Sequence, residues 1–431
     1  MANKLKKINV VTLGCSKNLV DSEVLMRQLE GNYQIINDSN DDAHIVVINT
    51  CGFIADAKEE SIDTILSAVE AKKAGKLEKV FVTGCLSERY KTELKSEIEN
   101  VDGFYGVNEL LQILKDLKVD YKKELIGERH LTTPSHFAYL KVSEGCDRSC
   151  SFCAIPLIRG KHISKTEEQL VAEARFLASQ GVKEILLIAQ DLTYYGIDIY
   201  GKRTIVRLVE KIASIEGIEW IRLHYAYPAG FPEELFQLMD ENPKVCSYLD
   251  IPLQHINDRI LKSMKRGLGS EGTRRLVRTM KEKVKGVALR TTLIVGYPGE
   301  TEEEFEELLE FVKESEFDRL GVFKYSEEED TSAYKLDDNV SEEVKEERLD
   351  RVMALQQEIS LKLNKQREGK VFKTIIDRKE GEYFVGRTQF DSPEVDNEVL
   401  ISSNIKLTIG EFYNVLIERA DFFDLYGKVV K

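Results

Sequence analysis

Residues 143–153, SEGCDRSCSFC, place three cysteines at Cys-x3-Cys-x2-Cys spacing, directly after the short apolar run Phe137–Val142. Three thiolates so close together can hold an iron–sulfur cluster, and a four-iron cluster would keep one iron open for a ligand that is not protein. Zinc is the competing metal, but zinc loops usually close with a second Cys or His pair, and none follows at suitable spacing. An ordinary loop with three idle thiols is the remaining alternative.

This spacing, with Phe152 directly before the last cysteine, resembles the signature of the radical S-adenosylmethionine (SAM) enzymes. The resemblance implies that Cys146, Cys150 and Cys153 are catalytic and are the ligands of a 4Fe-4S cluster whose open iron binds SAM. It also implies that the backbone near Phe152 lies against the adenine of SAM. Members of this family pass an electron from the cluster to SAM and release a 5′-deoxyadenosyl radical.

Length and composition limit the broad class. With 431 residues, the chain is too long for one ordinary domain, so two or three are expected. Its 42% apolar and 32% charged residues are typical of a soluble globular protein. No stretch approaches the length of a signal-peptide core or a membrane span, so the sequence predicts a cytoplasmic protein without a membrane partner. The net charge of −14 argues against a generic nucleic-acid binder, which would carry a basic face.

The first segment of the chain repeats an apolar run, a tight turn and a helical stretch. The runs are Ile8–Leu13, Ala43–Ile48 and Lys79–Val82. This alternation predicts βαβ units and a parallel sheet. A cysteine beside a glycine follows each run: Cys15, Cys51 and Cys85. A single cysteine there is most often a small buried residue. Three at the carboxyl edge of one sheet, where such sheets bind ligands, indicate a second metal site.

A charged helical stretch, Glu109–Lys123, and a linker, Ile126–Pro134, end this segment. Six strand-like runs with helices between them follow: Phe137–Val142, Glu184–Ala189, Trp220–Ala226, Val245–Ile251, Val287–Val295 and Leu320–Tyr325. Because eight such units make a closed barrel, six predict a partial, open barrel with its catalytic groups at the carboxyl ends of the strands. His224 and His255 stand at such ends, where a hydrogen-bonded structural histidine is the more usual role. Cys246 is predicted to be core, and Arg290 to face the barrel interior as a carboxylate partner.

After a long helix near Ser341–Lys365, the pattern changes to five short runs separated by turns. These runs predict a small closed antiparallel β-barrel of the OB-like kind. They are Phe372–Asp377, Glu382–Gln389, Glu398–Ile401, Phe412–Glu418 and Asp424–Val430. Residues 366–431 contain ten Lys plus Arg against twelve Asp plus Glu, and the loop Asp391–Asp396 is acidic as well. A phosphate backbone would be repelled there, whereas a basic protein surface would be attracted.

Together, an α/β domain (1–130), a partial TIM-type radical SAM barrel (131–365) and a small barrel similar to a TRAM domain (366–431) resemble the methylthiotransferases. The resemblance covers essentially the whole chain. It implies that Cys15, Cys51 and Cys85 hold a second 4Fe-4S cluster, which carries the sulfur to be delivered. One SAM would methylate the sulfur, and a second would supply the radical that removes hydrogen from an unactivated carbon. Four residues are the SAM contacts that the resemblance implies: Gln190, Gln254, Arg290 and Gly296.

Two stretches resemble the branch of this family that modifies a ribosomal protein. They are residues 14–23, GCSKNLVDSE, with Ser16 where proline is usual, and residues 386–396, GRTQFDSPEVD. A departure is Asp330, in the acidic loop 327–330, where glycine is expected. The known substrate of that branch is protein twelve of the small ribosomal subunit, modified on the β-carbon of an aspartate. That protein is basic, in agreement with an acidic C-terminal barrel.

We therefore expect a methylthiotransferase whose substrate is ribosomal protein twelve, free or on the ribosome. A reductant protein such as flavodoxin or ferredoxin is the expected second partner. The alternative is methylthiolation of tRNA adenosine, the reaction of the other branch, and the acidic barrel counts against it. A third hypothesis is a non-catalytic iron–sulfur electron carrier, for which the barrel and the third domain would have no use. Cleavage of an unactivated C–H bond needs cofactor chemistry, so the protein's role is to hold the reactants in line.

Overall fold

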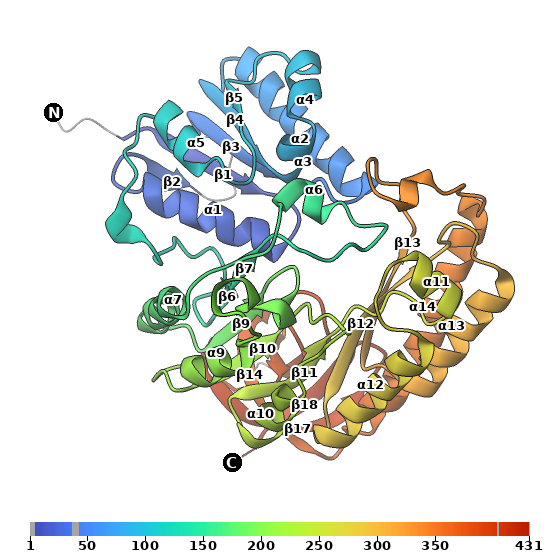
Figure 1. Ribbon diagram of the computed structural model, residues 1–431. Coiled ribbons are helices and arrows are strands. Elements are labelled where there is room, and N and C mark those ends of the chain that lie inside the picture. The colour runs from blue at the N-terminus through green and yellow to red at the C-terminus, as the bar shows by residue number, and fades with distance from the viewer. Residues whose placement is uncertain (1–4, 37–42, 403–404, 431) are drawn as a thin grey trace. The chain divides into compact units, whose positions relative to one another are not determined.

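The computed structural model describes residues 5–36, 43–402 and 405–430. The chain divides into two compact units (Figure 1). The first comprises residues 1–132, 144–148 and 153–163, and the second comprises residues 133–143, 149–152 and 164–431. The division passes through the cysteine loop, so Cys146 and Cys153 are part of the first unit and Cys150 is part of the second. The paired short strands β7 (Ser143–Glu144) and β8 (Ile163–Ser164) flank this loop in the sequence.

The first unit is built on a five-stranded parallel sheet in the order β2-β1-β3-β4-β5. Its strands are β1 (Lys7–Thr12), β2 (Gln34–Ile36), β3 (Ile45–Thr50), β4 (Lys79–Gly84) and β5 (Gly103–Phe104). Its helices are α1 (Ser16–Leu29), α2 (Ala55–Lys73), α3 (Cys85–Arg89), α4 (Lys91–Glu97), α5 (Leu110–Asp116) and α6 (Ile155–Arg159), with the 3₁₀ turn η1 (Lys123–Leu125). The sequence predicts the three central strands. The two edge strands are too short to show a pattern of alternation.

Helices cover both faces of this sheet, because successive side chains of a strand point to opposite faces. Ile45 and Val47 of β3 pack with α1 and α5, whereas Val46 and Ile48 pack with α2, α3 and α4. One predicted helix is wrong in its length, since α5 ends at Asp116 rather than near residue 123. Its end is set by Lys118, whose φ of 58° lies in the left-handed region.

The sheet of the second unit has six parallel strands in the order β13-β12-β11-β10-β9-β6. They are β6 (Phe137–Lys141), β9 (Glu184–Ile188), β10 (Trp220–Leu223), β11 (Val245–Asp250), β12 (Ala288–Val295) and β13 (Arg319–Lys324). The helices between and after them are α7 (Glu167–Ser179), α8 (Ile197–Tyr200), α9 (Ile205–Ala213), α10 (Glu234–Glu241), α11 (Asp258–Ser263), α12 (Ser270–Lys283), α13 (Glu302–Ser315) and α14 (Glu342–Lys365). The 3₁₀ turns are η2 (Leu192–Tyr194) and η3 (Ala333–Lys335). The sheet does not close, as predicted for a partial barrel.

The C-terminal part of the second unit is a closed barrel with the strand order β14-β15-β16-β18-β17. The strands are β14 (Val371–Glu380), β15 (Tyr383–Thr388), β16 (Glu398–Ser402), β17 (Phe412–Ala420) and β18 (Asp424–Val429). Its interior is filled by alternate apolar side chains, among them Ile376, Val399, Val415 and Ile417. The predicted antiparallel pairing is right for every neighbouring pair except β16 and β18, which run parallel. In the described residues, no helix of either unit is long and apolar enough to cross a membrane.

This barrel packs against the six-stranded sheet through an apolar contact and a buried charge network. The ring of Trp220 on β10 lies edge-on to Phe412 of β17, with 4.8 Å between the ring centroids. The buried carboxylate of Glu184 on β9 accepts from Arg222 Nε and from Arg387 Nη2, both at 2.8 Å. Burial alone would raise the pKa of Glu184, but the two guanidinium groups lower it below its usual value. The predicted second and third domains therefore form one compact unit.

Replacing Arg387 with methionine is expected to lower the free energy of unfolding by about 3–5 kcal/mol, because a buried charge pair loses one partner. Besides Glu184, Arg387 contacts Asp377, with 2.6 Å between Nε and Oδ2. The measurement is urea unfolding followed by the fluorescence of Trp220, the single tryptophan of the chain. The control is Arg378→Met on β14. The Arg378 side chain is 46% exposed, so its ion pairs should contribute at most about 1 kcal/mol to the free energy of unfolding. Equal losses in the two variants would contradict the prediction.

Candidate functional site

The three N-terminal cysteines follow β1, β3 and β4, which are neighbours in the first sheet. The loops that carry them are in contact. A Cβ atom at Gly14, whose φ is +85°, would lie 2.7 Å from Cys51 Cβ and 2.8 Å from Cys51 Sγ. A Cβ atom at Gly52 would lie 2.8 Å from the backbone nitrogen of Leu86, the residue after Cys85. Only glycine fits at these two positions, so the sequence brings the three cysteine loops together at one edge of the sheet.

Asn18, on the first turn of α1, ties these loops to one another. Its buried amide donates to the carbonyl of Leu13 at 2.9 Å and to the carbonyl of Thr50 at 3.0 Å, just before the first two cysteine turns. Its Oδ1 lies 3.6 Å from Cys85 Sγ and accepts a hydrogen bond from Arg159 Nη2. One amide group therefore contacts the chain at all three strand ends.

Arg159 at the end of α6 is a charged residue of this edge that the sequence analysis does not identify. It is 3% exposed, and Nη1 donates to Asp21 Oδ2 at 3.1 Å and to Glu144 Oε1 at 2.9 Å. Burial alone would lower its pKa, but Asp21, Cys85 and Glu144 raise it, so the guanidinium stays charged. Burial raises the pKa of the Cys85 thiol to about 12, against the opposing effect of the Arg159 charge. A cysteine binds a metal as the thiolate, and a fixed positive charge beside Cys85 favours that form, so the arrangement fits metal binding.

Burial also raises the pKa of the Cys51 thiol, whereas Cys15 is exposed. Among residues 5–36, 43–402 and 405–430, no three His, Cys, Asp or Glu side chains are close enough together to form a ready-made metal site. The structure therefore brings together the loops of the N-terminal cysteines, but not three thiols in the geometry of a closed metal site.

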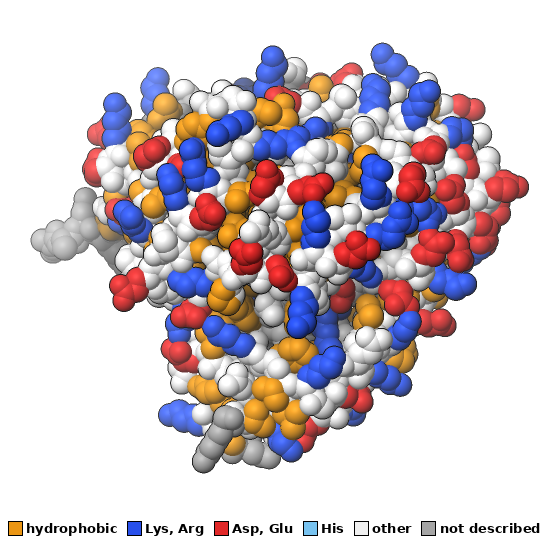
Figure 2. Space-filling view, turned by 60° about the horizontal axis from the view of Figure 1, so that its bottom comes forward, with side chains coloured by type: hydrophobic (Ala, Val, Ile, Leu, Met, Phe, Trp, Pro, Cys, Tyr) orange, Lys and Arg blue, Asp and Glu red, His pale blue; other side chains and the backbone are white. Residues whose placement is uncertain are grey.

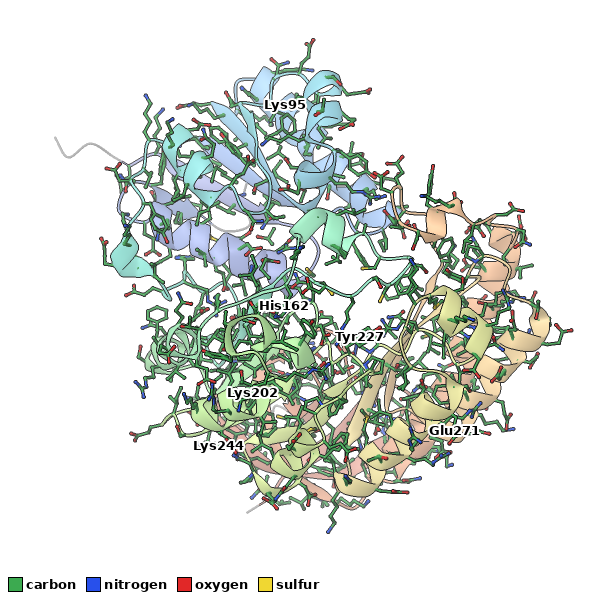
Figure 3. The ribbon with its side chains drawn as sticks, viewed as in Figure 1. Lys95, His162, Lys202, Tyr227, Lys244 and Glu271 are labelled. Carbon is green, nitrogen blue, oxygen red and sulfur yellow. The ribbon has the colours of Figure 1, made fainter. Side chains whose placement is uncertain are left out.

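The ends of the second cysteine loop are held within the first unit. Cys146 N donates to Gly160 O at 3.0 Å, and His162 N donates to Asp147 Oδ1 at 3.0 Å. His162 is buried and is labelled in Figure 3. The backbone of the loop is thus fixed by residues that follow it closely in the sequence. The thiols of Cys146, Cys150 and Cys153 are half-buried.

The middle of this loop is held within the second unit. Ser151 N donates to Met264 O at 3.1 Å, and the Ser151 hydroxyl lies 2.9 Å from the Tyr297 hydroxyl. Arg266 Nη1 donates to Cys150 Sγ at 3.2 Å. The Arg266 guanidinium lies 4.4 Å from the ring centroid of Tyr227, which is labelled in Figure 3. Arg266 is therefore a second buried arginine beside a predicted ligand, and a lone arginine after α11 gives no signal in the sequence.

The residues expected to contact SAM lie at or near the carboxyl ends of the second sheet. Gln190 is half-buried after β9, and Phe152 packs on apolar residues of this unit that include Ile294 and Tyr325. Gln254 follows β11 with a φ of 75°, a strained value for a residue that is not glycine. Gly296 follows β12, where a Cβ atom would lie 2.2 Å from Lys345 Cγ, so packing against α14 already requires a glycine. No ligand contact of these residues is tested by the geometry, and each remains a prediction.

Arg290 is the fourth expected SAM contact and points to carboxylates. Its Nε lies 3.4 Å from Asp396 Oδ1, and its Nη1 lies 4.0 Å from Asp250 Oδ1. The expectation that Arg290 is a carboxylate partner is confirmed. His224 and His255 are buried, as expected of structural histidines, with His224 Nε2 3.1 Å from Ser392 Oγ and His255 Nδ1 accepting from Asn257 N at 3.0 Å. Cys246 is fully buried, as predicted.

The acidic loop 391–396 differs from the prediction, because most of its charge is used inside the protein. Asp391 is fully buried and pairs with Arg319, and burial, which would raise its pKa, is outweighed by that guanidinium, so the pKa is lowered. The Asp396 side chain is 1% exposed and accepts from the Tyr248 hydroxyl at 2.8 Å. Glu394 is the exposed carboxylate of the loop. The expectation that Asp391 and Asp396 attract a basic partner is therefore wrong.

Three family models match successive parts of the chain. They are the uncharacterized protein family UPF0004 over residues 7–106, the radical SAM superfamily over residues 140–312 and the TRAM domain over residues 369–430. The chain is 58% identical over 426 residues to the ribosomal protein uS12 methylthiotransferase RimO of Christiangramia forsetii, covering 99% of this chain and 94% of that protein. The RimO of Flavobacterium johnsoniae is 58% identical over 429 residues, covering 99% of this chain and 98% of that protein. The chain belongs to the RimO family of methylthiotransferases.

Solved structures of more distant proteins share the fold of this RimO-family chain. The radical S-adenosylmethionine methyltransferase TsrM from Kitasatospora setae, with cobalamin and a [4Fe-4S] cluster bound, matches with a TM-score of 0.56 at 14% identity. That match covers 88% of this chain and 77% of TsrM. The cobalamin-dependent S-adenosylmethionine radical enzyme OxsB, with aqua-cobalamin bound, matches with a TM-score of 0.51 at 14% identity, covering 82% of this chain and 56% of its own. At such identities the likeness concerns the fold alone.

Membership of the RimO family confirms the predicted branch of the methylthiotransferases, and the chain is a radical SAM enzyme. The α/β fold with an N-terminal domain, a radical SAM barrel and a TRAM barrel is confirmed as well. The tRNA-modifying branch, the alternative drawn from the sequence, is not better supported, since relatives at 58% identity are uS12 methylthiotransferases. Membership of the radical SAM superfamily carries with it one iron–sulfur cluster and SAM as cofactors.

Proposed function

We propose that this chain adds a methylthio group to the β-carbon of an aspartate in ribosomal protein uS12. The observation that carries the proposal is the presence of two cysteine sets in a chain that matches uS12 methylthiotransferases over nearly its whole length. The radical cluster is proposed to bind to Cys146, Cys150 and Cys153. The second 4Fe-4S cluster is proposed to bind at the three strand ends of the first sheet: Cys15, Cys51 and Cys85.

The contact between the Gly14 turn and Cys51 supports the second cluster. Because a side chain at position 14 would meet the Cys51 sulfur, the edge of the sheet is kept clear of Cβ atoms where the thiols are. Charged Arg159 and the Asn18 amide add polar groups beside Cys85 that an idle buried thiol would not need. When bound, the two clusters and two SAM molecules would supply the sulfur, the methyl group and the radical.

The chain's own residues position the reactants and exclude water. The backbone near Phe152 is proposed to lie against the adenine, with the Phe152 ring anchored in the apolar cluster of the second unit. Gln190, Gln254 and Gly296 are proposed SAM contacts because they follow the carboxyl ends of three strands of one sheet. Arg290 is retained with them because it is paired in register with Asp250, the last residue of β11.

The protein partner is proposed to be basic uS12, free or on the ribosome, in the cytoplasm. Glu394 and Glu382 are exposed carboxylates of the C-terminal barrel that remain for such a partner. Figure 2 shows Lys and Arg side chains interspersed with Asp and Glu side chains on the face in view. A reductant protein such as flavodoxin or ferredoxin is proposed as the second partner.

Deleting the gene for this chain is expected to remove one methylthio group from uS12 and to leave the tRNA nucleosides unchanged. The measurement is mass spectrometry of ribosomal proteins and of digested tRNA from cells with and without the gene. Restoring the gene should restore the modification, and a copy with Cys150→Ala should not. Loss of methylthio-adenosine, with uS12 unchanged, would move the chain to the tRNA-modifying branch.

A further inference from the structure

The buried guanidinium of Arg159, at the end of α6, has several partners outside its own helix. Its guanidinium donates to two carboxylates, Asp21 and Glu144, and to the amide oxygen of Asn18. The same amide oxygen lies 3.6 Å from Cys85 Sγ. Ala154 and Ile158, from the segment that ends at Arg159, pack directly on Cys85. The segment after the second cysteine loop is thus fitted to the third cysteine of the N-terminal set, and all these residues are in the first unit.

Two of the three residues that hold Arg159, Asn18 and Asp21, are part of the stretch GCSKNLVDSE at residues 14–23. Asn18 and Asp21 lie one helical turn apart on α1, which begins directly after Cys15. Asn18 also donates to the carbonyls of Leu13 and Thr50, which lie just before two of the cysteine turns. The stretch that distinguishes the two branches of the family therefore also has a structural role. It fixes one buried positive charge at the carboxyl edge of the sheet.

We propose that Arg159 is a positioning residue of the N-terminal three-cysteine site, where its charge offsets the three thiolates and sets the reduction potential of the iron–sulfur cluster. This inference rests on the proposed second cluster. A cluster with three thiolate ligands gains negative charge when it is reduced, and a nearby fixed positive charge in a poorly solvated place stabilises that reduced form. Asp21 and Glu144 keep the guanidinium in place. Asn18 Oδ1, which accepts from Arg159, lies 3.6 Å from Cys85 Sγ and so links the guanidinium to this cysteine.

Arg129 shows what an ordinary buried ion pair looks like in the same unit. Its Nη1 lies 3.1 Å from Glu23 Oε2, and both side chains are at most 2% exposed. Glu23 is also on α1, where it accepts from Thr132 N at 2.8 Å and so ties the helix to the segment after residue 128. Arg129 thus provides a matched control, because its removal breaks a buried ion pair of α1 without removing the charge beside Cys85.

The test uses the full chain with Cys146, Cys150 and Cys153 changed to alanine, so that any bound cluster belongs to the N-terminal set. Iron and sulfide per chain and the midpoint potential, from EPR-monitored titration with dithionite, are measured in this parent. The same measurements follow in the parent with Arg159→Gln, Arg159→Lys or Arg129→Gln. Arg159→Gln is expected to lower the ratio of reduced to oxidised cluster at a fixed potential about tenfold, a shift of about 59 mV for one electron. Arg159→Lys keeps the charge and should stay close to the parent, as should Arg129→Gln.

The outcomes separate this inference from the proposed function. A parent that binds no iron overturns the second cluster and the role of Arg159 with it. A parent and an Arg159→Gln variant with equal iron and equal potential overturn the inference and leave the cluster standing. If Arg159→Gln loses iron while Arg159→Lys and Arg129→Gln keep it, the charge is needed for the three thiolates, as proposed. Equal loss of iron in Arg159→Gln, Arg159→Lys and Arg129→Gln would show a general effect of buried ion pairs and overturn the inference.

Discussion

Replacing Cys150 with alanine is expected to abolish cleavage of SAM to 5′-deoxyadenosine, to the level seen without enzyme. Two protein ligands cannot hold a cluster that three thiolates were needed to bind, and without the cluster no electron reaches SAM. Cys150 is also the proposed ligand beside Arg266, whose Nη1 lies 3.2 Å from its sulfur. The measurement is chromatographic detection of 5′-deoxyadenosine after anaerobic reconstitution with iron, sulfide and dithionite.

The matched control is Cys246→Ala, since Cys246 is the one cysteine of the chain outside the two proposed sets. It is fully buried on β11, in a cluster with Trp220, Tyr248 and Ile375. Its truncation should cost about 1 kcal/mol of stability through the lost packing and should leave SAM cleavage intact. A Cys150→Ala protein that still cleaves SAM at the unaltered rate would sink the assignment of the radical cluster.

The strands and the two cysteine sets could be predicted because their signals are local. In the first segment, apolar runs of four to six residues are each followed within three residues by a cysteine beside a glycine, so these strand ends are visible without knowledge of the fold. The parallel order then follows from the helices between the runs. The convergence of Cys15, Cys51 and Cys85 needed one further step, that the carboxyl ends of parallel strands share an edge. The contact of Gly14 with Cys51 agrees with that step.

The two arginines could not be predicted, because nothing in the local sequence distinguishes them. Arg159 is one of the chain's 61 Lys and Arg residues, and its task depends on Asp21 and Asn18, which lie about 140 residues earlier. The contact of Arg266 with Cys150 likewise joins residues that lie far apart in the sequence. A buried charge is defined by what surrounds it, and these surroundings are assembled only by the fold.

The prediction for the acidic loop 391–396 was wrong for the opposite reason. Its composition gives a strong signal, and the usual interpretation of a charged loop is a solvated surface. Here Asp391 and Asp396 face the six-stranded sheet of the same unit, where Arg319, Tyr248 and Arg290 satisfy them. The closed barrel packs on that sheet, so a loop that looks exposed in the sequence is buried by strands more than 70 residues earlier.

Replacing Cys51 with alanine is expected to stop methylthiolation of uS12 while SAM cleavage continues. Cys51 belongs to the N-terminal cysteine set, so Cys146, Cys150 and Cys153, the proposed ligands of the radical cluster, are unchanged. The variant should fold, because the turn is held by backbone bonds that alanine keeps: Cys51 N donates to Ser61 Oγ at 3.0 Å, and Ser61 Oγ donates to Cys51 O at 2.9 Å. The loss of product therefore reports on sulfur rather than on folding.

Two assays on one sample measure this separation. With a uS12 substrate present, 5′-deoxyadenosine is quantified by chromatography and the methylthio group on uS12 by mass spectrometry. Cys15→Ala and Cys85→Ala should give the same pattern, because the three thiols are proposed to hold one cluster and none is replaceable. Cys246→Ala should keep both products. If the Cys51 variant still formed methylthiolated uS12, the sulfur would come from elsewhere. The first sheet would then carry three cysteines for a reason other than a second cluster.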